Sequence, residues 1–245
     1  MAPAERAREA LRAKVARTPL QRRVDALLDR IEYRRVETEA ELAVVRRHRH
    51  AEYVAAGNIE PRADGMMEDA DDHGTATRVY TAWLDGALAG SVRLSVLRGA
   101  SREGLTIQCF PDIVEPMLDT GTTVIDPNRL TTASALSRTE PALIFAVLRL
   151  ATMAASHYGA EHCLTPIRPH HGAFYRRFLH ATRLCEGRVF PGTSVRMELY
   201  DVHVPSAFQS ADRGSPFVAA PDRAITAIFP SEEELGLSPA KRAVG

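Results

Sequence analysis

The chain has 245 residues, of which 45% are hydrophobic and 25% charged, and its 31 basic side chains balance its 31 acidic ones. This composition is typical of a globular protein large enough for one sizeable core, and it excludes a disordered or a membrane-embedded chain. No apolar run reaches the roughly 18 residues that a membrane-spanning helix needs, and charged residues occupy the place of a secretory signal's apolar stretch, so we expect a cytoplasmic protein.

The spacing of the cysteines and of the candidate carboxylate ligands predicts neither a metal centre nor a disulfide framework. Cys109, Cys163 and Cys185 are widely spaced and lack a C-x-x-C pattern, so we expect reduced packing residues. Asp69 and Asp72 lack the Asp-x-Asp-x-Asp-Gly loop of calcium sites. The sequence therefore predicts no bound metal.

The N-terminal part is helical and basic. Apolar residues recur near helical spacing from 3 to 31, with a break at Pro19, and a second helix is predicted over 37–56 with Gly57 as its cap. Residues 1–49 hold thirteen Arg and Lys against eight Asp and Glu. Such a face attracts nucleic acid, an acidic membrane surface or an acidic protein; the alternative is a solvated amphipathic helix.

Strand signals begin after a polar loop at 58–77. Two alternating apolar runs over 78–97 are joined by Asp85-Gly86, which is a strong hairpin signal. A short amphipathic stretch follows at 113–118. The remaining predicted elements are a strand at 122–132 with a bulge near Pro127, a helix from Pro141 to Gly159, a strand at 161–167, a helix at 172–179 and a strand at 194–200.

This order of elements predicts an α/β fold with a mixed sheet and helices on both faces. We expect three parts: a basic helical extension at 1–32, a domain at 33–204 and an irregular tail at 205–245. Within the tail, Ser231 and Glu234 have the spacing of a capping box that opens a short helix.

Four segments, taken together, resemble a known family. They are HRHAEYVAAGNI at 48–59, GSVRLSVL at 90–97, CFPDIVEPML at 109–118 and VIDPNRLTT at 124–132, and the acidic loop adds Asp69 and Asp72. Their order resembles that of the N-acyl amino acid synthases and the related acyl-homoserine lactone synthases. The resemblance covers about residues 33–200.

The resemblance implies a GNAT-like acyltransferase fold with an N-terminal helical extension. Its expected activity is transfer of a fatty acyl chain from a phosphopantetheine thioester, on acyl carrier protein more than on coenzyme A, to the amine of an amino acid. No permanently bound cofactor, no nucleic acid and no membrane segment is expected. The alternative is an autoinducer synthase that uses S-adenosylmethionine. Asn58 stands where an aromatic residue is common in lactone synthases, which argues against that alternative.

The predicted donor loop at 131–141 contains no glycine. GNAT acetyltransferases hold the coenzyme A pyrophosphate on backbone N–H groups of a glycine-rich loop at a helix N-terminus. A carrier protein presents a single phosphate, for which Ser134, Ser137 and Arg138 suffice. The loop therefore favours an acyl-carrier donor.

Two arginines in apolar strands are the main site candidates. Because an unpaired buried guanidinium is costly, Arg93 and Arg129 should have carboxylate partners among Asp69, Asp72 and Asp126. One interpretation places these residues around the acceptor, where an arginine binds a substrate carboxylate through two parallel hydrogen bonds. The alternative is that the arginines clamp the acidic loop to the sheet.

Acyl transfer also needs an oxyanion site and proton transfer. Backbone N–H groups around 129–131 are the expected oxyanion donors. Asp126 is the first candidate for a base or polarising group, or else a strand-end residue that bonds the Asn128 backbone. Tyr175 is the candidate acid for the leaving thiolate, or else a packing aromatic.

The other substrate-binding candidates come from the helix end, the phenylalanine segment and the segment 166–175. His170 and His171 can relay protons near neutral pH, or simply form a helix-start surface. The resemblance adds Arg49 and Phe110 to the substrate-binding residues. A third hypothesis is non-enzymatic, namely a GNAT-like domain that binds acyl chains or a partner without turnover.

Overall fold

A seven-stranded mixed sheet forms the centre of the computed structural model, which describes residues 18–210 and 227–237. Its strands run in the order β1-β2-β3-β4-β5-β7-β6; β4 and β5 are parallel and the other neighbours antiparallel. The strands are β1 (Ile31–Arg35), β2 (Thr77–Leu84), β3 (Ala87–Leu97), β4 (Val124–Thr132), β5 (His162–Ile167), β6 (Thr182–Val189) and β7 (Arg196–His203). The predicted α/β class with a mixed sheet is confirmed.

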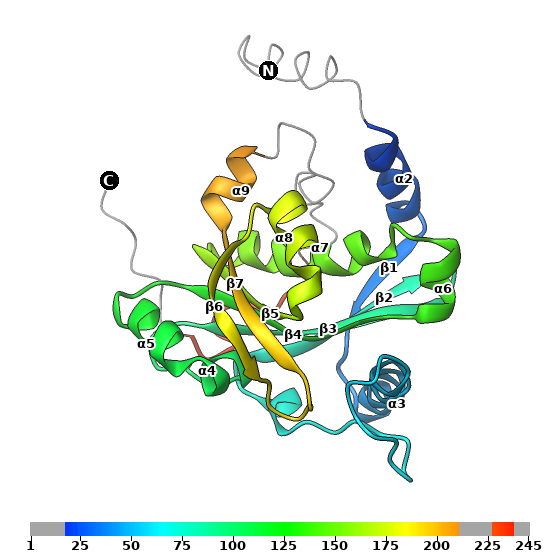
Figure 1. Cartoon of the computed structure of the whole chain (residues 1–245), viewed down its shortest axis with the longest axis horizontal. Helices are drawn as coiled ribbons and strands as arrows, with labels where there is room; N and C mark the ends of the chain where they lie inside the picture. The colour runs from blue at the N-terminus through cyan, green and yellow to red at the C-terminus, as the bar shows by residue number, and fades with distance from the viewer. Residues whose placement is uncertain (1–17, 211–226, 238–245) are drawn as a thin grey trace.

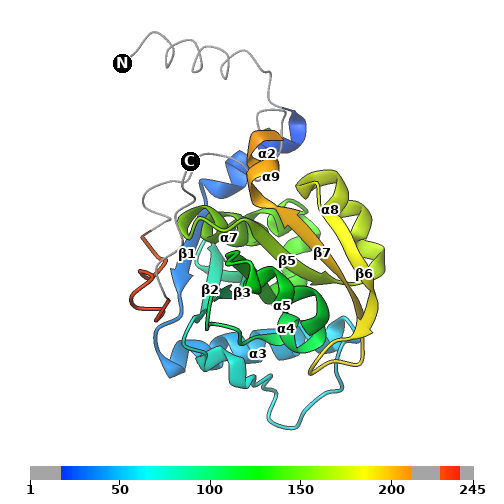
Figure 2. The ribbon, with the colours of Figure 1, turned by 90° about the vertical axis from the view of Figure 1, so that its left-hand side faces the viewer.

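Helices cover both faces of the sheet (Figures 1 and 2). One face carries α2 (Pro19–Leu28), α7 (Leu143–His157), α8 (Gly172–Leu179) and α9 (Val204–Ser210). The other carries α3 (Glu39–Ala55), η1 (Ala70–His73), α4 (Leu105–Cys109) and α5 (Pro111–Asp119). Two short helices follow strand ends, namely α6 (Ser134–Thr139) after β4 and η2 (Pro169–His171) after β5.

The core follows the apolar pattern of the sequence. Helix α7 is the central apolar element, with Leu143, Val147 and Leu150 fully buried against the sheet. The opposite face has a second cluster around Phe110, under α4 and α5. The Asp85-Gly86 hairpin is confirmed, because both residues have the positive φ (50° and 82°) that a type I′ turn requires.

The sequence pattern did not predict the two edge strands, β1 and β6. Ile31 was expected to be helical, but α2 ends at Leu28 and Ile31 begins β1, whose residues alternate between half-buried and exposed. Strand β6 is mostly exposed and so lacks an apolar alternation. An edge strand buries little of either face, and therefore leaves a weak signal.

Three further boundaries differ from expectation. Pro141 lies before α7 instead of in its first turn, and residues 134–139 of the expected donor loop form α6. Ser231 and Glu234 do exchange the two capping hydrogen bonds, but turns follow them, so the expected helix is wrong. The expected helix before Pro19 lies outside the described residues. The division of the chain into three parts remains a prediction.

Candidate active site

A cleft opens in the middle of the sheet, where β4 and β5 separate. The two strands pair only at Val124–His162 and Ile125–Cys163, after which β4 continues beside β3, and β5 beside β7. Pro127, two residues after Ile125, has no N–H to offer a neighbouring strand. The resulting cleft has a volume of about 910 Å³, and residues of both diverging strands line it. The sheet therefore has a V-shaped gap between β4 and β5.

A bulge in β4 borders this cleft. The register with β3 shifts so that Ser91 faces Thr131 while Arg93 faces Asn128, which leaves one more residue on β4 than on β3. Arg129 takes up the difference with φ at +52°, a conformation that non-glycine residues rarely adopt. The bulge interrupts the ladder at 129–131, the segment expected to supply the oxyanion donors.

Beneath the sheet, buried arginines and aspartates form one network. Asp69 Oδ2 lies 3.0 Å from Arg93 Nη1 and 2.6 Å from Arg129 Nε, so one carboxylate joins both arginines. Asp72 pairs with Arg49 at 2.7 Å and with Arg93 at 3.4 Å. The expected carboxylate partners Asp69 and Asp72 are thus confirmed, and the two strand arginines lie on the same side of the sheet.

Burial and the neighbouring charges have opposing effects on the pKa values in this network. Burial raises the pKa of Asp69, but the charges of Arg93 and Arg129 and their hydrogen bonds outweigh it, so the pKa lies below its ordinary value. Burial, helped by the charges of Asp69 and Asp72, raises the pKa of neighbouring Asp71 against the opposing charges of Arg93 and Arg129. It also lowers the pKa of Arg49, against the opposing effect of Asp72. Burying the guanidinium groups of these arginines without a partner would be energetically costly, so the carboxylates of Asp69 and Asp72 are needed.

Arg93 and Arg129 differ in their access to the cleft. Arg93 is fully buried and is not among the cleft-lining residues. Its ion pairs are with aspartates of the acidic loop. Arg129 lines the cleft: its Nη2 donates to the Pro191 carbonyl at 3.2 Å and its guanidinium lies 6.0 Å from the Tyr53 ring centre. Arg129 Nη1 has no hydrogen-bond partner within the described residues. Of these two arginines, Arg129 is therefore the one that lines the cleft with an unpartnered donor.

Asp126 lies under the sheet and does not line the cleft. Its side chain is completely buried, Oδ1 accepts a hydrogen bond from Thr106 Oγ1, and Oδ2 has no partner within the described residues. Burial raises the pKa of Asp126 to about 6, although Thr106 and Arg93 oppose the shift. Its role as a base remains a prediction, for which this structure offers no contact with the cleft.

The segment after β5 brings three candidates to the opposite wall. Tyr175, His170 and His171 all line the cleft, and the two histidine rings lie 4.2 Å apart. Burial lowers the pKa of His171, and His170 and Arg168 lower it further, so this imidazole is a neutral proton acceptor near pH 7. Burial raises the pKa of Tyr175 well above its usual range, so its hydroxyl keeps its proton.

The donor-side candidates of α6 also reach the cleft. Ser134, Ser137 and Arg138 line it, and Ser137 Oγ is buried without a partner in the described chain. The backbone N–H of Ser134 is occupied, because it donates to Glu52 Oε1 at 3.1 Å. A protein carboxylate thus sits where an anion would meet the start of α6.

Two residues implied by the resemblance lie elsewhere. Phe110 is fully buried in the second core cluster, with the Arg188 guanidinium 5.1 Å from its ring centre. Arg49 is buried in its ion pair with Asp72. Neither is among the cleft-lining residues. A role in substrate binding remains a prediction for both.

Sequence reasoning missed part of the cleft wall. Tyr53 and Glu52 come from the last turns of α3, Phe190 and Thr193 from the turn between β6 and β7, and Met197 from β7. Tyr53 was within the segment 48–59 that carried the resemblance, which is the signal that could have found it. Phe190 and Thr193 gave no signal because β6 and the turn after it were not predicted, whereas Met197 lies in the predicted strand at 194–200 but was not assigned to the site.

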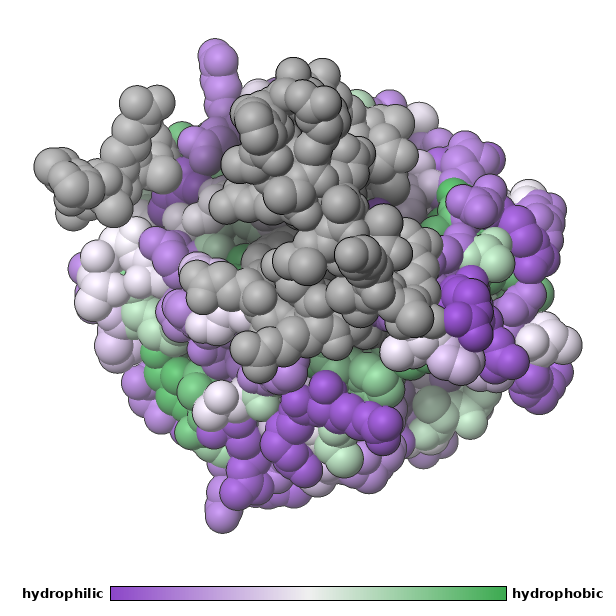
Figure 3. All heavy atoms as spheres, turned by 90° about the horizontal axis from the view of Figure 1, so that it is seen from above, coloured by the Kyte–Doolittle hydropathy of each residue, from purple (hydrophilic) through white to green (hydrophobic). Residues whose placement is uncertain are grey.

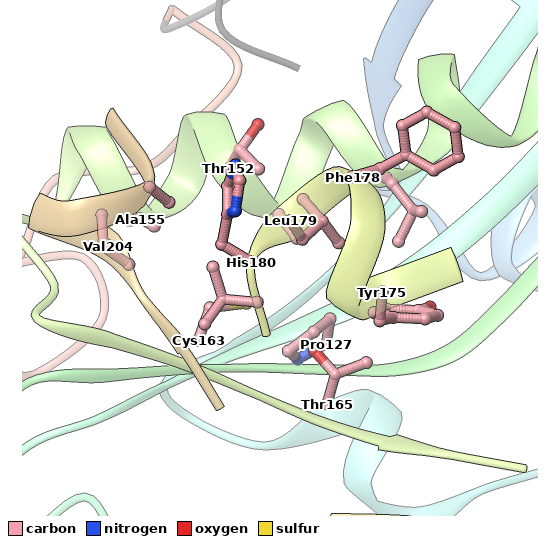
Figure 4. Close-up of a pocket in the computed structure, with 14 residues that line it drawn as sticks. Pro127, Thr152, Ala155, Cys163, Thr165, Tyr175, Phe178, Leu179, His180 and Val204 are labelled. Carbon is pink, nitrogen blue, oxygen red and sulfur yellow. The ribbon is translucent and has the colours of Figure 1, made fainter. Parts of the chain in front are cut away.

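A small apolar pocket continues from the cleft, behind Tyr175. The two share Pro127, Leu148, Thr165 and Tyr175. The pocket has a volume of about 30 Å³, and Figure 4 shows side chains of α7, β5, α8 and the start of α9 around it, among them Ala155, Cys163, Leu179 and Val204. Its walls are almost entirely hydrocarbon, so it suits an alkyl group and not a charged one.

The splayed sheet, the bulged fourth strand and the helix α7 beside the cleft define a GNAT-like acyltransferase. The model of the FeeM N-acyl amino acid synthase family matches residues 45–203. This chain belongs to that family. No curated protein matches the chain in sequence.

Solved structures share the fold at low sequence identity. FeeM, an N-acyl amino acid synthase from uncultured soil microbes, is 16% identical with a TM-score of 0.61, over 74% of this chain and 94% of FeeM. The acyl-homoserine lactone synthase LasI is 14% identical with a TM-score of 0.58, over 79% and 98% of the chains. BjaI, a coenzyme A-dependent acyl-homoserine lactone synthase solved with MTA, is 15% identical with a TM-score of 0.51, over 80% and 97%.

In the described part of the chain, no helix combines the length and the apolar character needed to cross a bilayer.

Proposed function

We propose that this acyltransferase moves a fatty acyl chain from the phosphopantetheine thioester of an acyl carrier protein to the amine of an amino acid. The observation that carries the proposal is the free Nη1 donor of Arg129, held in the cleft wall by Asp69 and the Pro191 carbonyl. A guanidinium fixed in this way binds a substrate carboxylate with defined geometry. Every amino acid acceptor carries such a carboxylate beside its amine.

The cleft supplies the remaining requirements of acyl transfer. The acceptor amine attacks the thioester carbonyl, and backbone N–H groups at the 129–131 bulge stabilise the oxyanion. His171 is neutral and accepts the proton that the amine loses, and Tyr175 offers a hydroxyl proton to the leaving thiolate. Asp69 and Asp72 keep the arginine network charged and in place.

The apolar pocket behind Tyr175 receives the acyl chain in this proposal. It begins where the cleft narrows between Pro127, Thr165 and Tyr175, and it is lined by hydrocarbon. A chain threaded there leaves its thioester beside the bulge. Each buried methylene contributes about 0.8 kcal/mol, so the few methylenes that fit the pocket's volume of about 30 Å³ favour a longer chain over an acetyl group.

A carrier-protein donor is supported by the start of α6. The 131–141 segment has no glycine, and the Ser134 N–H already binds the Glu52 carboxylate, which would repel a pyrophosphate. Ser137 and Arg138 are left for a single phosphate. The structurally similar BjaI is a coenzyme A-dependent synthase, so the two donors are compared directly.

The test is incubation of the purified protein with one long-chain acyl thioester, presented on carrier protein or on coenzyme A, and a mixture of amino acids. Mass spectrometry should detect an N-acyl amino acid with the carrier-protein donor. Turnover of the coenzyme A thioester alone would overturn the donor, and release of methylthioadenosine from S-adenosylmethionine would establish the lactone-type reaction instead.

Arg129→Lys tests the acceptor contact. A lysine keeps the charge but cannot form the two-pronged bond, so we expect the KM for the amino acid to rise by about ten- to a hundredfold while the KM for the donor changes little. Arg138→Lys is the matched variant on the donor side and should show the opposite pattern. Equal changes in both Michaelis constants for Arg129→Lys would exclude a specific carboxylate contact.

A further inference from the structure

The turn between β6 and β7, residues 190–195, reaches the cleft beside Arg129. Its Pro191 carbonyl accepts a hydrogen bond from Arg129 Nη2 at 3.2 Å, and Phe190 and Thr193 line the cleft. Figure 1 shows β6 and β7 running to this turn on the side of the sheet that carries α3, whereas α7, α8 and α9 lie on the other side. The turn therefore borders the end of the cleft at which Arg129 lies.

Hydrogen bonds within the turn fix its shape. Thr193 donates from its backbone N–H and from Oγ1 to the Phe190 carbonyl, at 3.1 and 3.0 Å. The Val195 N–H donates to Thr193 Oγ1 at 3.3 Å, and the Phe190 N–H donates to the Val195 carbonyl at 2.9 Å. Because these bonds close the turn on itself, the Pro191 carbonyl holds a defined position relative to the whole turn.

Asn58 connects this turn to two other segments that line the cleft. Its backbone carbonyl accepts hydrogen bonds from Ser194 N and Ser194 Oγ, both at 3.4 Å. Its side-chain oxygen accepts one from Arg168 Nη2, which also donates to the Ala56 carbonyl at 3.2 Å. The end of α3, the segment after β5 and the turn are thus joined at one residue, the one that departs from the aromatic pattern of lactone synthases.

Gly192 allows the turn to approach Arg129 closely. Its φ is +71°, and an added Cβ would lie 2.7 Å from Arg129 Nη2 and 3.8 Å from Nη1. The nearest atoms belong to the end of a side chain and not to backbone, so a methyl group there would displace the guanidinium and leave the strands in place. Glycine therefore permits the hydrogen bond that orients Arg129.

We propose that Gly192 and Asn58 are positioning residues for the acceptor. They hold the 190–195 turn against Arg129, so that Nη1, which has no hydrogen-bond partner within the described residues, faces the substrate carboxylate. This inference rests on the proposed function. The acyl pocket lies beside α7, α8 and the start of α9 on the other face, which Figure 3 shows from above as a mixture of hydrophilic and apolar areas. Changes in the turn should therefore alter acceptor binding and spare the donor.

Gly192→Ala tests the contact with Arg129, and Gly99→Ala is its control. Both glycines are exposed and have positive φ (+71° and +58°), but an added Cβ at Gly99 meets no atom within 4 Å. We expect Gly192→Ala to raise the KM for the amino acid about tenfold and to change the donor KM by less than about twofold. The same acceptor as its primary amide, which lacks the carboxylate, should show no such rise. Gly99→Ala should change neither constant.

Asn58→Ala and Asn58→Asp test the connection to the segment after β5. The alanine removes the acceptor of the Arg168 hydrogen bond, so we expect the KM for the amino acid to rise about three- to tenfold. The aspartate keeps an oxygen in that place and should restore the KM to within about twofold of the unmodified value. A KM as high for Asn58→Asp as for Asn58→Ala would exclude Asn58 as a positioning residue.

Nitrogen-15 NMR of the arginine side chains follows Arg129 independently of turnover, and Arg129→Lys identifies its signal by removing it. The Arg129 Nε–H donates to Asp69 at 2.6 Å, so it should exchange slowly with solvent. Gly192→Ala should accelerate this exchange by at least about tenfold, because a displaced guanidinium loses that hydrogen bond more often. Gly99→Ala should leave the exchange unchanged.

The exchange and the Michaelis constants together separate this inference from the proposed function. Faster exchange in Gly192→Ala, together with a higher KM for the amino acid alone, supports the inference. Unchanged exchange, or faster exchange with an unchanged KM, overturns it. Faster exchange in a protein that forms no N-acyl amino acid would uphold the orientation of Arg129 by the turn and reject the proposed reaction.

Discussion

Arg49, Arg93 and Arg129 are all buried, but their contacts differ. Arg49 and Arg93 are fully enclosed and face aspartates of the acidic loop, so they hold that loop against the sheet. Arg129 shares Asp69 with Arg93 but also reaches the cleft. Arg49 and Arg93 therefore have the clamping contacts that the sequence offered as one interpretation, whereas binding of a substrate carboxylate remains a proposal for Arg129.

Asp69 connects the two roles, and Asp69→Asn tests the connection. The change leaves two buried guanidinium groups sharing a neutral amide, so we expect a loss of about 3 kcal/mol in the free energy of unfolding, measured by urea denaturation. Asp64→Asn removes an exposed partner of Arg62 and should leave the urea midpoint nearly unchanged. Similar midpoints for the two variants would mean that the buried network adds nothing to stability.

Asp126 makes stability depend on pH in an identifiable direction. Its pKa is about 6 in the folded protein and 3.8 in the unfolded reference, so the folded state holds the proton more tightly. Its contribution is therefore greatest below about pH 4 and is lost as the pH rises through about 6, by about 3 kcal/mol in total. Asp126→Asn removes this dependence.

The measurement is urea unfolding of both proteins across that pH range. The asparagine variant should gain on the unmodified protein as the pH rises from 4 to 7, because it never carries the buried charge. A difference between the two proteins that stays constant over this range would show that Asp126 does not titrate as described.

At the level of elements, the bulge in β4 depends on a close approach to β3. An added Cβ at Gly90 would lie 2.5 Å from the Thr131 carbonyl oxygen and 2.7 Å from Val147 Cγ2, so a side chain there must displace β4 or α7. Glycine at this position therefore positions the segment proposed to hold the oxyanion.

Gly90→Ala should accordingly cost both stability and activity. We expect a loss of about 1 to 3 kcal/mol from overpacking, and a fall in kcat at saturating substrates because the 129–131 backbone shifts. Gly187→Ala in β6 is the matched control, since its added Cβ meets Arg196 Cβ at 3.4 Å, an ordinary contact. A stable Gly90→Ala variant with unchanged kcat would show that the bulge geometry is unimportant for turnover.

In the whole molecule, the helices on the two faces of the sheet contribute different walls of the cleft. Helix α3 contributes Tyr53 from beneath the sheet, whereas α7 and α8 contribute the apolar pocket from above it. The gap between β4 and β5 is the passage between these two sides. An acceptor beside Arg129 and an acyl chain behind Tyr175 can therefore meet at the bulge.

The length of the accepted acyl chain should depend on the inner end of the pocket. Ala155→Val adds bulk there, so we expect kcat/KM for the longest accepted chain to fall by about tenfold, with shorter chains spared, in a series of acyl-carrier donors. Ala173→Val on the exposed side of α8 should leave the chain-length profile unchanged. Uniform loss for all chain lengths would place the acyl chain elsewhere.

The sequence by itself determined the elements whose apolar residues repeat over a long stretch or whose turn chemistry is specific. The α7 helix, the Asp85-Gly86 hairpin and the strand with Arg129 belong to this group, because periodicity and φ preference are local properties. The pairing of Arg93 and Arg129 with loop aspartates also followed from the cost of burying a lone charge.

Only the tertiary structure decided what faces the cleft. Asp126 and Arg129 come from the same strand, yet only Arg129 lines the cleft, while Asp126 is fully buried. Phe110 lies in the core, and Glu52 meets Ser134 across a separation of 82 residues. Such contacts depend on how the chain brings distant segments together, and no local pattern of residues encodes them.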